Sequence, residues 1–160
     1  MTLMKNWYLI KSKPRQEDIA VNNLENQNYC TYCPKSVINK KEVVLFPGYI
    51  FIQLDKKTQD WIPIRSTKGV SNFVRFGLNF AKVPNSVIEF IKSNELKTKD
   101  KMINLNNYKL GDNVQITEGV FKNCVAIFKS FKPNDRVMLL INLLGQQQSI
   151  NTERKSIIGL

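Results

Sequence analysis

The sequence predicts an α+β protein with two domains. Segments with strand-like and helix-like hydrophobic patterns alternate through residues 1–94, whereas closely spaced turn signals mark residues 108–160. Residues 95–107 are polar and lack hydrophobic periodicity, as expected of a linker. The N-terminal order of strand, helix, strand, strand, helix, strand and helix predicts a mostly antiparallel sheet covered by helices.

Each N-terminal element is expected from its local pattern. The expected strands are 6–11, 29–37, 46–54 and 70–76, and the expected helices are 16–27, 58–64 and a third helix that starts at Pro84. Glu17 and Asp18 suit the positive end of the first helix dipole. Pro63 is expected to cut the second helix short. Two of the strands, 29–37 and 46–54, are expected to pair as one long hairpin.

The strand at 46–54 has two chemically different faces. Ile50, Ile52 and Leu54 alternate toward one side, which is expected to face the core of the sheet. Tyr49 and Phe51 point to the opposite side. This aromatic side needs a partner, and either a covering helix of the same domain or the surface of another protein would satisfy it.

The C-terminal part allows two folds. Its turn signals, which include Gly111-Asp112, Pro133-Asn134-Asp135 and Gly145, are spaced as in a small β-barrel. Residues 137–144 also fit a helix, in which Val137, Leu140, Ile141 and Leu144 share one face with Phe121, Val125 and Phe128 as the matching stripe of an antiparallel partner. Gly145 opposes the helix, because glycine costs a continuing helix roughly 1 kcal/mol.

The composition argues against an enzyme and against a metal or cofactor site. The chain has no histidine, and no phosphate-binding glycine motif is visible. Cys30 and Cys33 form one Cys-x-x-Cys, which Cys124 alone cannot complete to four zinc ligands. The apolar stretches are too short to span a bilayer and no signal pattern opens the sequence, so we expect a cytoplasmic protein.

The charge points to an anionic partner. The net charge is +11, of which residues 1–94 contribute +7 (14 basic and 7 acidic) and residues 95–160 contribute +4 (10 and 6). Nucleic acid is the expected partner for such a chain. Charge alone is also compatible with a basic protein that is merely soluble.

Four motifs resemble the N-terminal domain of the NusG family of transcription elongation factors. They are Trp7-Tyr8, Tyr32-Cys33-Pro34-Lys35, Leu45-Phe46-Pro47-Gly48-Tyr49-Ile50-Phe51 and Gly69-Val70-Ser71-Asn72-Phe73-Val74-Arg75-Phe76-Gly77. The segment from Gly111 to Phe121 is similar to the C-terminal KOW domain of that family. The block from Phe73 to Gly77 and the tail from Thr117 to Leu143 most resemble the specialised paralogue RfaH.

This resemblance implies an antiterminator that binds RNA polymerase and suppresses pausing and termination. The implied contacts with the polymerase clamp helices are Tyr49, Phe51, Phe76, Ile88 and Ile91. The implied contacts with the non-template DNA strand are Lys11, Lys13, Arg15, Gln16, Thr67, Lys68 and Arg75. Such basic and amide side chains suit the phosphates and base edges of an unpaired strand.

The resemblance to RfaH also implies that the C-terminal domain switches fold. It would pack as a helical hairpin on the polymerase-binding face and later refold into a barrel that binds the ribosome, through ribosomal protein S10. The implied interdomain residues are Glu42, Arg136, Phe128, Leu140 and Leu144. A monomer is expected.

Two departures from RfaH leave alternatives open. Asp60-Trp61-Ile62-Pro63 replaces the polar segment that touches the polymerase gate loop, and Trp61 is typical of general NusG proteins. The acidic partner of Arg136 aligns with Val43, so that Glu42 is one residue out of register. A general NusG-type factor with independent domains and a translation-associated RNA-binding KOW module remain the other interpretations.

Overall fold

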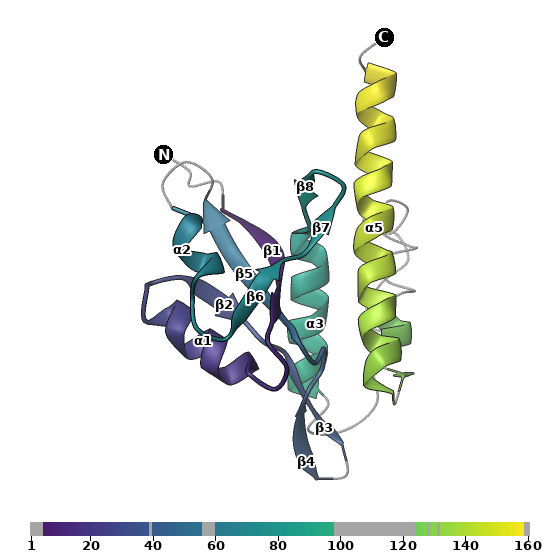
Figure 1. Ribbon diagram of the computed structural model, residues 1–160. Helices are drawn as coiled ribbons and strands as arrows, with labels where there is room; N and C mark the ends of the chain where they lie inside the picture. Colours follow the sequence, from purple (N-terminus) through teal and green to yellow (C-terminus); the bar gives the residue numbers. More distant parts are fainter. Residues whose placement is uncertain are drawn as a thin grey trace.

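The computed structural model describes residues 5–38, 40–55, 60–97, 124–127, 129–130 and 132–158 (Figure 1). The strands are β1 (Lys5–Ser12), β2 (Cys30–Tyr32), β3 (Lys35–Ile38), β4 (Lys41–Val44), β5 (Tyr49–Asp55), β6 (Val70–Phe73), β7 (Arg75–Phe76), β8 (Asn79–Phe80) and β9 (Lys82–Val83). The helices are α1 (Glu17–Glu25), α2 (Ile62–Arg65), α3 (Asn85–Lys97) and α5 (Pro133–Ile158), and residues 124–127 add one helical turn. The predicted α+β class is confirmed.

One antiparallel sheet organises these elements. Its strands follow the order β2-β5-β1-β6, and β9 pairs with β1 beside them. β1 and β5 run together for seven residue pairs, from Lys5 opposite Asp55 to Lys11 opposite Tyr49. Two short ribbons, β3–β4 and β7–β8, lie outside this sheet.

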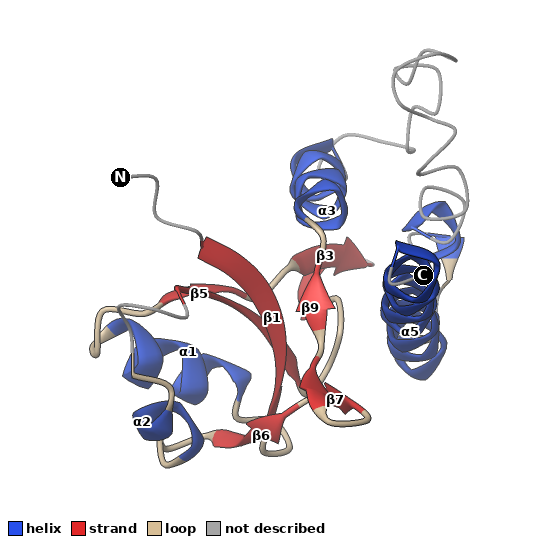
Figure 2. Cartoon of the chain, turned by 90° about the horizontal axis from the view of Figure 1, so that it is seen from above, coloured by secondary structure: helices blue, strands red, loops and turns tan. Residues whose placement is uncertain are grey.

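Helices cover both faces of the sheet. Figure 2 shows α1 and α2 on one side of β1 and β5, with α3 and α5 on the other side. The first side encloses the α1 cluster, which consists of the buried residues Tyr8, Ile10, Ala20, Leu24, Ile50, Ile52, Leu54, Ile64, Val70 and Phe73. It contains all three aliphatic residues of β5 that were expected to face the core.

The second side encloses a larger group of buried side chains, here called the α5 cluster. Its members are Trp7, Leu9, Leu45, Phe46, Phe51, Ala81, Val83, Val87, Ile88, Phe90, Ile91, Cys124, Ile127, Leu140, Leu143 and Leu144. Phe51 belongs to it, and Tyr49 packs against it. Alternate residues of β5 therefore pack in two separate cores, one on each side of the sheet, as the strand pattern predicts.

The expected long hairpin is interrupted. β2 pairs with β5, whereas β3 and β4 form a ribbon of their own. Pro34 ends the first run, since proline has no N–H to donate to a ladder. A turn ends the second: the Tyr49 N–H donates to the Phe46 carbonyl at 3.1 Å, and Gly48 has φ +86°. Proline at the second position and a positive φ at the third define a type II turn.

Three helix boundaries differ from the sequence prediction. Pro63 lies in the first turn of α2 and begins that helix instead of cutting it, because the first helical positions need no N–H. α3 continues to Lys97, so the first three residues of the predicted linker are helical. α5 runs through Gly145, which was expected to oppose a continuing helix.

The helical alternative therefore describes residues 133–158. Neighbouring Leu143 and Leu144 are at most 1% exposed, and burying one leucine contributes about 1.5–3 kcal/mol, which exceeds the cost of one glycine in a helix. The turn signals between residues 108 and 123 lie outside the described part of the chain. Within that part, no helix is long and apolar enough to cross a membrane.

Candidate functional site

The five candidate polymerase contacts lie together on the α3 side of the sheet. Phe51, Ile88 and Ile91 are at most 2% exposed, and all three belong to the α5 cluster. Tyr49 and Phe76 are half-buried and pack against the same cluster. β5 contributes two of these side chains, α3 contributes two and β7 contributes one. The structure thus brings the whole predicted set onto one face.

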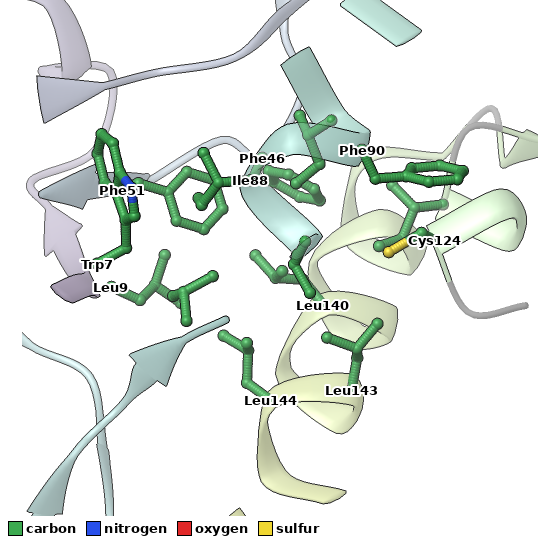
Figure 3. Close-up of a cluster of buried hydrophobic side chains, with 14 of the residues drawn as sticks. Trp7, Leu9, Phe46, Phe51, Ile88, Phe90, Cys124, Leu140, Leu143 and Leu144 are labelled. Atoms are coloured by element: carbon green, nitrogen blue, oxygen red, sulfur yellow. The ribbon is translucent and has the colours of Figure 1, made fainter. Parts of the chain in front are cut away.

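This face is covered by α5. Figure 3 shows Leu140 and Leu144 projecting from α5 toward side chains of the sheet and of α3. Leu140 and Leu144 are completely buried and Leu143 is 1% exposed, whereas Met138 on the same helix is 62% exposed. The contact between α5 and this face is apolar. Burial of its three leucines contributes several kcal/mol to the free energy that holds α5 in place.

The helical turn at 124–127 closes the edge of this contact. Cys124 and Ile127 are buried in the α5 cluster, and Cys124 lies near Phe90 of α3 (Figure 3). Burial raises the pKa of the Cys124 thiol from 9.0 to about 12. Val125 is half-buried, while Phe121 and Phe128, the other members of the predicted stripe, lie outside the described residues.

Arg136 joins α5 to the sheet through main-chain oxygens. Its Nε donates to the Leu45 carbonyl at 2.8 Å and its Nη1 donates to the Ser130 carbonyl at 3.1 Å. The residue is 2% exposed, and burial lowers the pKa of its guanidinium. A backbone acceptor therefore takes the role expected of a carboxylate.

The predicted partner Glu42 does not make this contact. Its carboxylate lies 3.6 Å from the Lys35 ammonium, which also lies 3.4 Å from Asp18. Neighbouring residues of a strand point to opposite sides, so a one-residue displacement along β4 turns the acidic side chain away from Arg136. The expected Glu42–Arg136 pair is thus corrected to an Arg136–Leu45 hydrogen bond.

Four of the seven candidate DNA contacts are exposed cations, three of them close to the start of α1 and the fourth, Lys11, in β1 opposite Tyr49. Lys11, Lys13, Arg15 and Lys68 are all exposed. The Lys13 N–H donates to the Gly69 carbonyl at 2.8 Å, which brings Lys13 beside Lys68. Lys13, Arg15 and Lys68 form a basic surface suited to a phosphate backbone.

Gly69 makes this arrangement possible. It has φ +95°, and a Cβ at this position would lie 2.7 Å from the backbone nitrogen of Ala20. Only glycine allows the start of β6 to approach α1 so closely. The separation of Lys13 and Lys68 is therefore set by the contact between β6 and α1.

The other three candidates have different surroundings. Thr67 is 7% exposed, and its hydroxyl accepts from Gln27 at 2.9 Å and donates to the Pro63 carbonyl at 2.8 Å. Arg75 lies over the Phe80 ring at 4.7 Å, on the β7–β8 ribbon and away from the basic surface. Gln16 is half-buried at the start of α1, next to the basic surface.

Sequence reasoning missed one residue of this region. Glu17 was assigned to the helix dipole, but its side chain is 9% exposed and its Oε1 accepts a hydrogen bond from the Gly48 N–H at 2.8 Å. The available signal was its spacing, because Glu17, Ala20 and Leu24 fall at i, i+3 and i+7 and are all buried. No cluster of three metal-ligating side chains occurs among the described residues.

The described chain combines an antiparallel sheet, an aromatic face and an adjoining basic surface, as expected of a protein that binds both a protein and a nucleic acid. The family described as "Transcription termination factor nusG" matches residues 5–92, which is more than half of the chain. The chain therefore belongs to the NusG family.

Individual relatives agree with this assignment. The transcription termination/antitermination protein NusG of Thermus thermophilus is 24% identical over 178 aligned positions, covering 95% of this chain and 97% of that protein. The NusG of Staphylococcus aureus is 24% identical over 93% of this chain and 92% of its own length. The Chlamydia pneumoniae NusG is 22% identical over 69% of this chain, and the match spans only 60% of that relative.

One solved structure is also similar. It is described as "Domain interaction in Thermotoga maritima NusG", with a TM-score of 0.43 and 19% sequence identity over 68% of this chain and 70% of that chain.

Proposed function

We propose that this protein is a transcription antitermination factor that binds RNA polymerase and the non-template DNA strand, suppresses pausing and termination, and has no chemistry of its own. Family membership supports the class of activity. The aromatic face of Tyr49, Phe51, Phe76, Ile88 and Ile91 is the proposed polymerase contact. The basic surface at Lys13, Arg15 and Lys68, together with Lys11 and Gln16, is the proposed DNA contact.

The main observation behind the proposal is that α5 covers the aromatic face. Leu140, Leu143 and Leu144 fill the same cluster as the proposed polymerase contacts. A factor whose binding face is covered in the resting chain must uncover it before it can bind. We therefore propose an RfaH-like factor, with residues 1–94 and 108–160 as its domains and α5 as the autoinhibitory segment.

Release of α5 would also free the C-terminal domain for a second role. Residues 137–144 satisfy the strand period as well as the helical one, so a barrel is available to them once the leucines leave the α5 cluster. In this proposal the barrel binds the ribosome and links translation to transcription in the cytoplasm.

A general NusG-type factor with two independent domains is the second candidate. The Asp60-Trp61-Ile62-Pro63 segment favours it, because Trp61 is stacked on Phe73 and Phe80 and meets Tyr8 edge-on, where an RfaH-like factor would carry a polar residue. The Thermus and Staphylococcus relatives carry the NusG name as well. The two candidates differ in whether the resting chain can bind polymerase.

Capture of purified bacterial RNA polymerase by the tagged full-length chain tests the proposal. Leu144→Asp places a charge in the α5 cluster and is expected to raise capture at least tenfold, which corresponds to about 1.4 kcal/mol. Met138→Asp changes an exposed position of the same helix and is expected to leave capture near the wild-type level.

A second set of variants tests the contact face. In the Leu144→Asp background, Tyr49→Ala together with Phe76→Ala is expected to abolish capture, because both half-buried side chains become exposed when α5 leaves. Leu78→Ala changes a side chain that is 97% exposed on the β7–β8 turn and is the matched control. Wild-type capture equal to that of Leu144→Asp would support the general factor, and capture that survives the double substitution would contradict the contact face.

A further inference from the structure

The carboxylate of Glu17 holds the turn that precedes β5. Glu17 is the first residue of α1, and its Oε1 accepts from the Gly48 N–H at 2.8 Å. The carbonyl of Gly48 accepts from the Ser12 N–H, also at 2.8 Å. Both peptide groups of Gly48 are thus bonded to the two ends of the segment 12–17. A hydrogen bond from a backbone N–H to a buried carboxylate is among the stronger ones in proteins.

The residue just before the same turn is held by α5. The Leu45 carbonyl, three residues before Gly48, accepts from Nε of Arg136 at 2.8 Å. Leu45 is otherwise fixed by its N–H, which donates to the Pro34 carbonyl at 2.9 Å. Between Leu45 and Gly48 lie only Phe46 and Pro47, and Phe46 is completely buried. A type II turn of this kind is stiff, because proline fixes one of its dihedral angles.

Through these contacts the position of the Leu45 carbonyl depends on the Glu17 carboxylate. A hydrogen bond to a buried guanidinium weakens steeply when its angle or length changes. Arg136 has no carboxylate among the described residues at ion-pair distance, so the Leu45 carbonyl is its link to the sheet. If the turn loses the Glu17 contact at Gly48, one of the bonds that position the Leu45 carbonyl is lost, and the hydrogen bond from the buried Arg136 guanidinium is weakened.

We propose that Glu17 is a positioning residue for closure: through the Gly48 N–H it fixes the turn at residues 46–49, and with it the adjoining Leu45 carbonyl on which Arg136 holds α5. This inference rests on the proposed function in that closure by α5 is taken as the resting state of the factor. The segment 12–17 carries Lys13, Arg15 and Gln16, so the residue that sets closure directly follows the proposed DNA contacts. Coupling of this kind acts equally in both directions.

The structure supplies a matched control for Glu17. Asp18 follows it in the first turn of α1 and carries the same charge, but its side chain is exposed and lies 3.4 Å from Lys35. Removing either carboxylate weakens the helix dipole interaction by a similar amount. Of these two carboxylates, only that of Glu17 contacts the turn at 46–49. A difference between the two substitutions therefore reports the turn contact.

Reactivity of the Cys124 thiol measures closure directly. Cys124 is completely buried in the α5 cluster, so a thiol reagent reaches it only when the contact opens. The experiment uses the full-length chain with Cys30→Ser and Cys33→Ser, which leaves Cys124 as the single cysteine of three. Glu17→Ala is expected to raise the reaction rate with dithionitrobenzoate roughly 5-fold to 150-fold, the usual range for coupled sites. Glu17→Gln retains Oε1 as an acceptor, so Cys124 should react nearly as slowly as in the single-cysteine chain with Glu17. Asp18→Ala should change the Cys124 reaction rate by no more than about twofold.

The order of the contacts is tested by a double substitution. Arg136→Met removes the bond to Leu45 and is expected to raise the Cys124 rate by itself. Glu17→Ala added to Arg136→Met should then raise it little further, because the turn no longer has a guanidinium to position. Rates that multiply independently would overturn the proposal, as would a Glu17→Ala rate equal to that of the starting chain or matched by Asp18→Ala.

A second measurement covers the case in which Glu17→Ala fails to fold. In the otherwise unaltered chain, Arg136→Met is expected to speed hydrogen exchange at the Gly48 amide while exchange within α1 stays unchanged. Equal exchange at Gly48 in both chains would overturn the proposal. Neither experiment contains polymerase, so a failure of polymerase capture and a failure of this coupling are separate results.

Discussion

Gly145 of α5 lies against the ring of Phe76. A Cβ at Gly145 would be 3.5 Å from Cε1 of Phe76, which is an ordinary van der Waals distance. The helix therefore passes the β7–β8 ribbon with room for one methyl group and little more. A residue that sequence rules place at the end of a helix instead lies inside it, at a contact with a proposed polymerase-binding side chain.

Gly145→Ala is expected to strengthen closure. Alanine favours a helix interior over glycine by about 1 kcal/mol, and the added methyl group fits against Phe76 without displacing it. The Cys124 reaction rate in the single-cysteine chain should fall about fivefold, and helicity measured by circular dichroism should rise or stay constant. Gly145→Leu provides the contrast, because its longer side chain would push α5 from Phe76. Faster Cys124 reaction in the alanine variant would mean that the contact with Phe76 has no room for a methyl group.

The stability of the chain should fall with alkaline pH through Cys124. Burial raises the pKa of this thiol from 9.0 to about 12, so the folded protein retains a proton that the unfolded chain releases. The stabilising contribution is complete below pH 9 and is lost as the pH rises toward 12, with a slope of at most about 1.4 kcal/mol per pH unit. Urea unfolding at pH 8 and pH 10 measures it. Cys124→Ala should show a smaller loss between the two pH values, and an equal loss would assign the effect to other groups.

Thr67→Val is expected to reduce stability and to leave DNA affinity nearly unchanged. The Thr67 hydroxyl is occupied by Gln27 and Pro63, and its loss should cost about 1 kcal/mol in the free energy of unfolding. Lys13→Ala should instead weaken binding of a single-stranded oligonucleotide and reduce its salt dependence by about 0.7 in the logarithmic slope. Fluorescence anisotropy at several salt concentrations separates the two effects. A large loss of affinity in Thr67→Val with unchanged stability would restore this residue as a direct DNA contact.

Two glycines with positive φ should respond differently to alanine. A Cβ added at Gly48 would meet no atom within 4 Å, so Gly48→Ala should cost only the roughly 1–2 kcal/mol of a left-handed alanine. Gly69→Ala adds a contact of 2.7 Å with the backbone of Ala20 to the same conformational cost. Its unfolding free energy should fall by clearly more, and oligonucleotide binding should weaken because Lys13 and Lys68 are displaced. Equal losses in the two variants, measured by urea unfolding, would show that β6 can retreat from α1 at little cost.

Local pattern was sufficient for much of the sheet. The alternation in β5 predicted both of its faces, and the acidic residues of the first turn of α1 predicted the start of that helix. The break between β3–β4 and the main sheet was missed, although Pro34 and Pro47 were visible in the sequence, because the hydrophobic runs on either side were treated as continuous.

The remaining differences depend on contacts between distant residues. The segment 137–144 satisfies two periods equally, and burial of Leu140 and Leu144 against α3 and the sheet favours the helical one. The partner of Arg136 was sought among carboxylates, whereas a main-chain carbonyl carries no sequence signal at all. The buried role of Glu17 likewise depends on a turn 31 residues away in the sequence.

The two tryptophans of the chain lie on opposite sides of the sheet. Trp7 belongs to the α5 cluster, with the Lys92 ammonium 5.3 Å from its ring centre, and Trp61 packs on the α1 side against Phe73 and Phe80. Each layer of the molecule therefore contains its own intrinsic fluorophore. Replacing one tryptophan with phenylalanine leaves emission from a single layer, so that departure of α5 and unfolding of the sheet can be followed as separate optical signals without any added label.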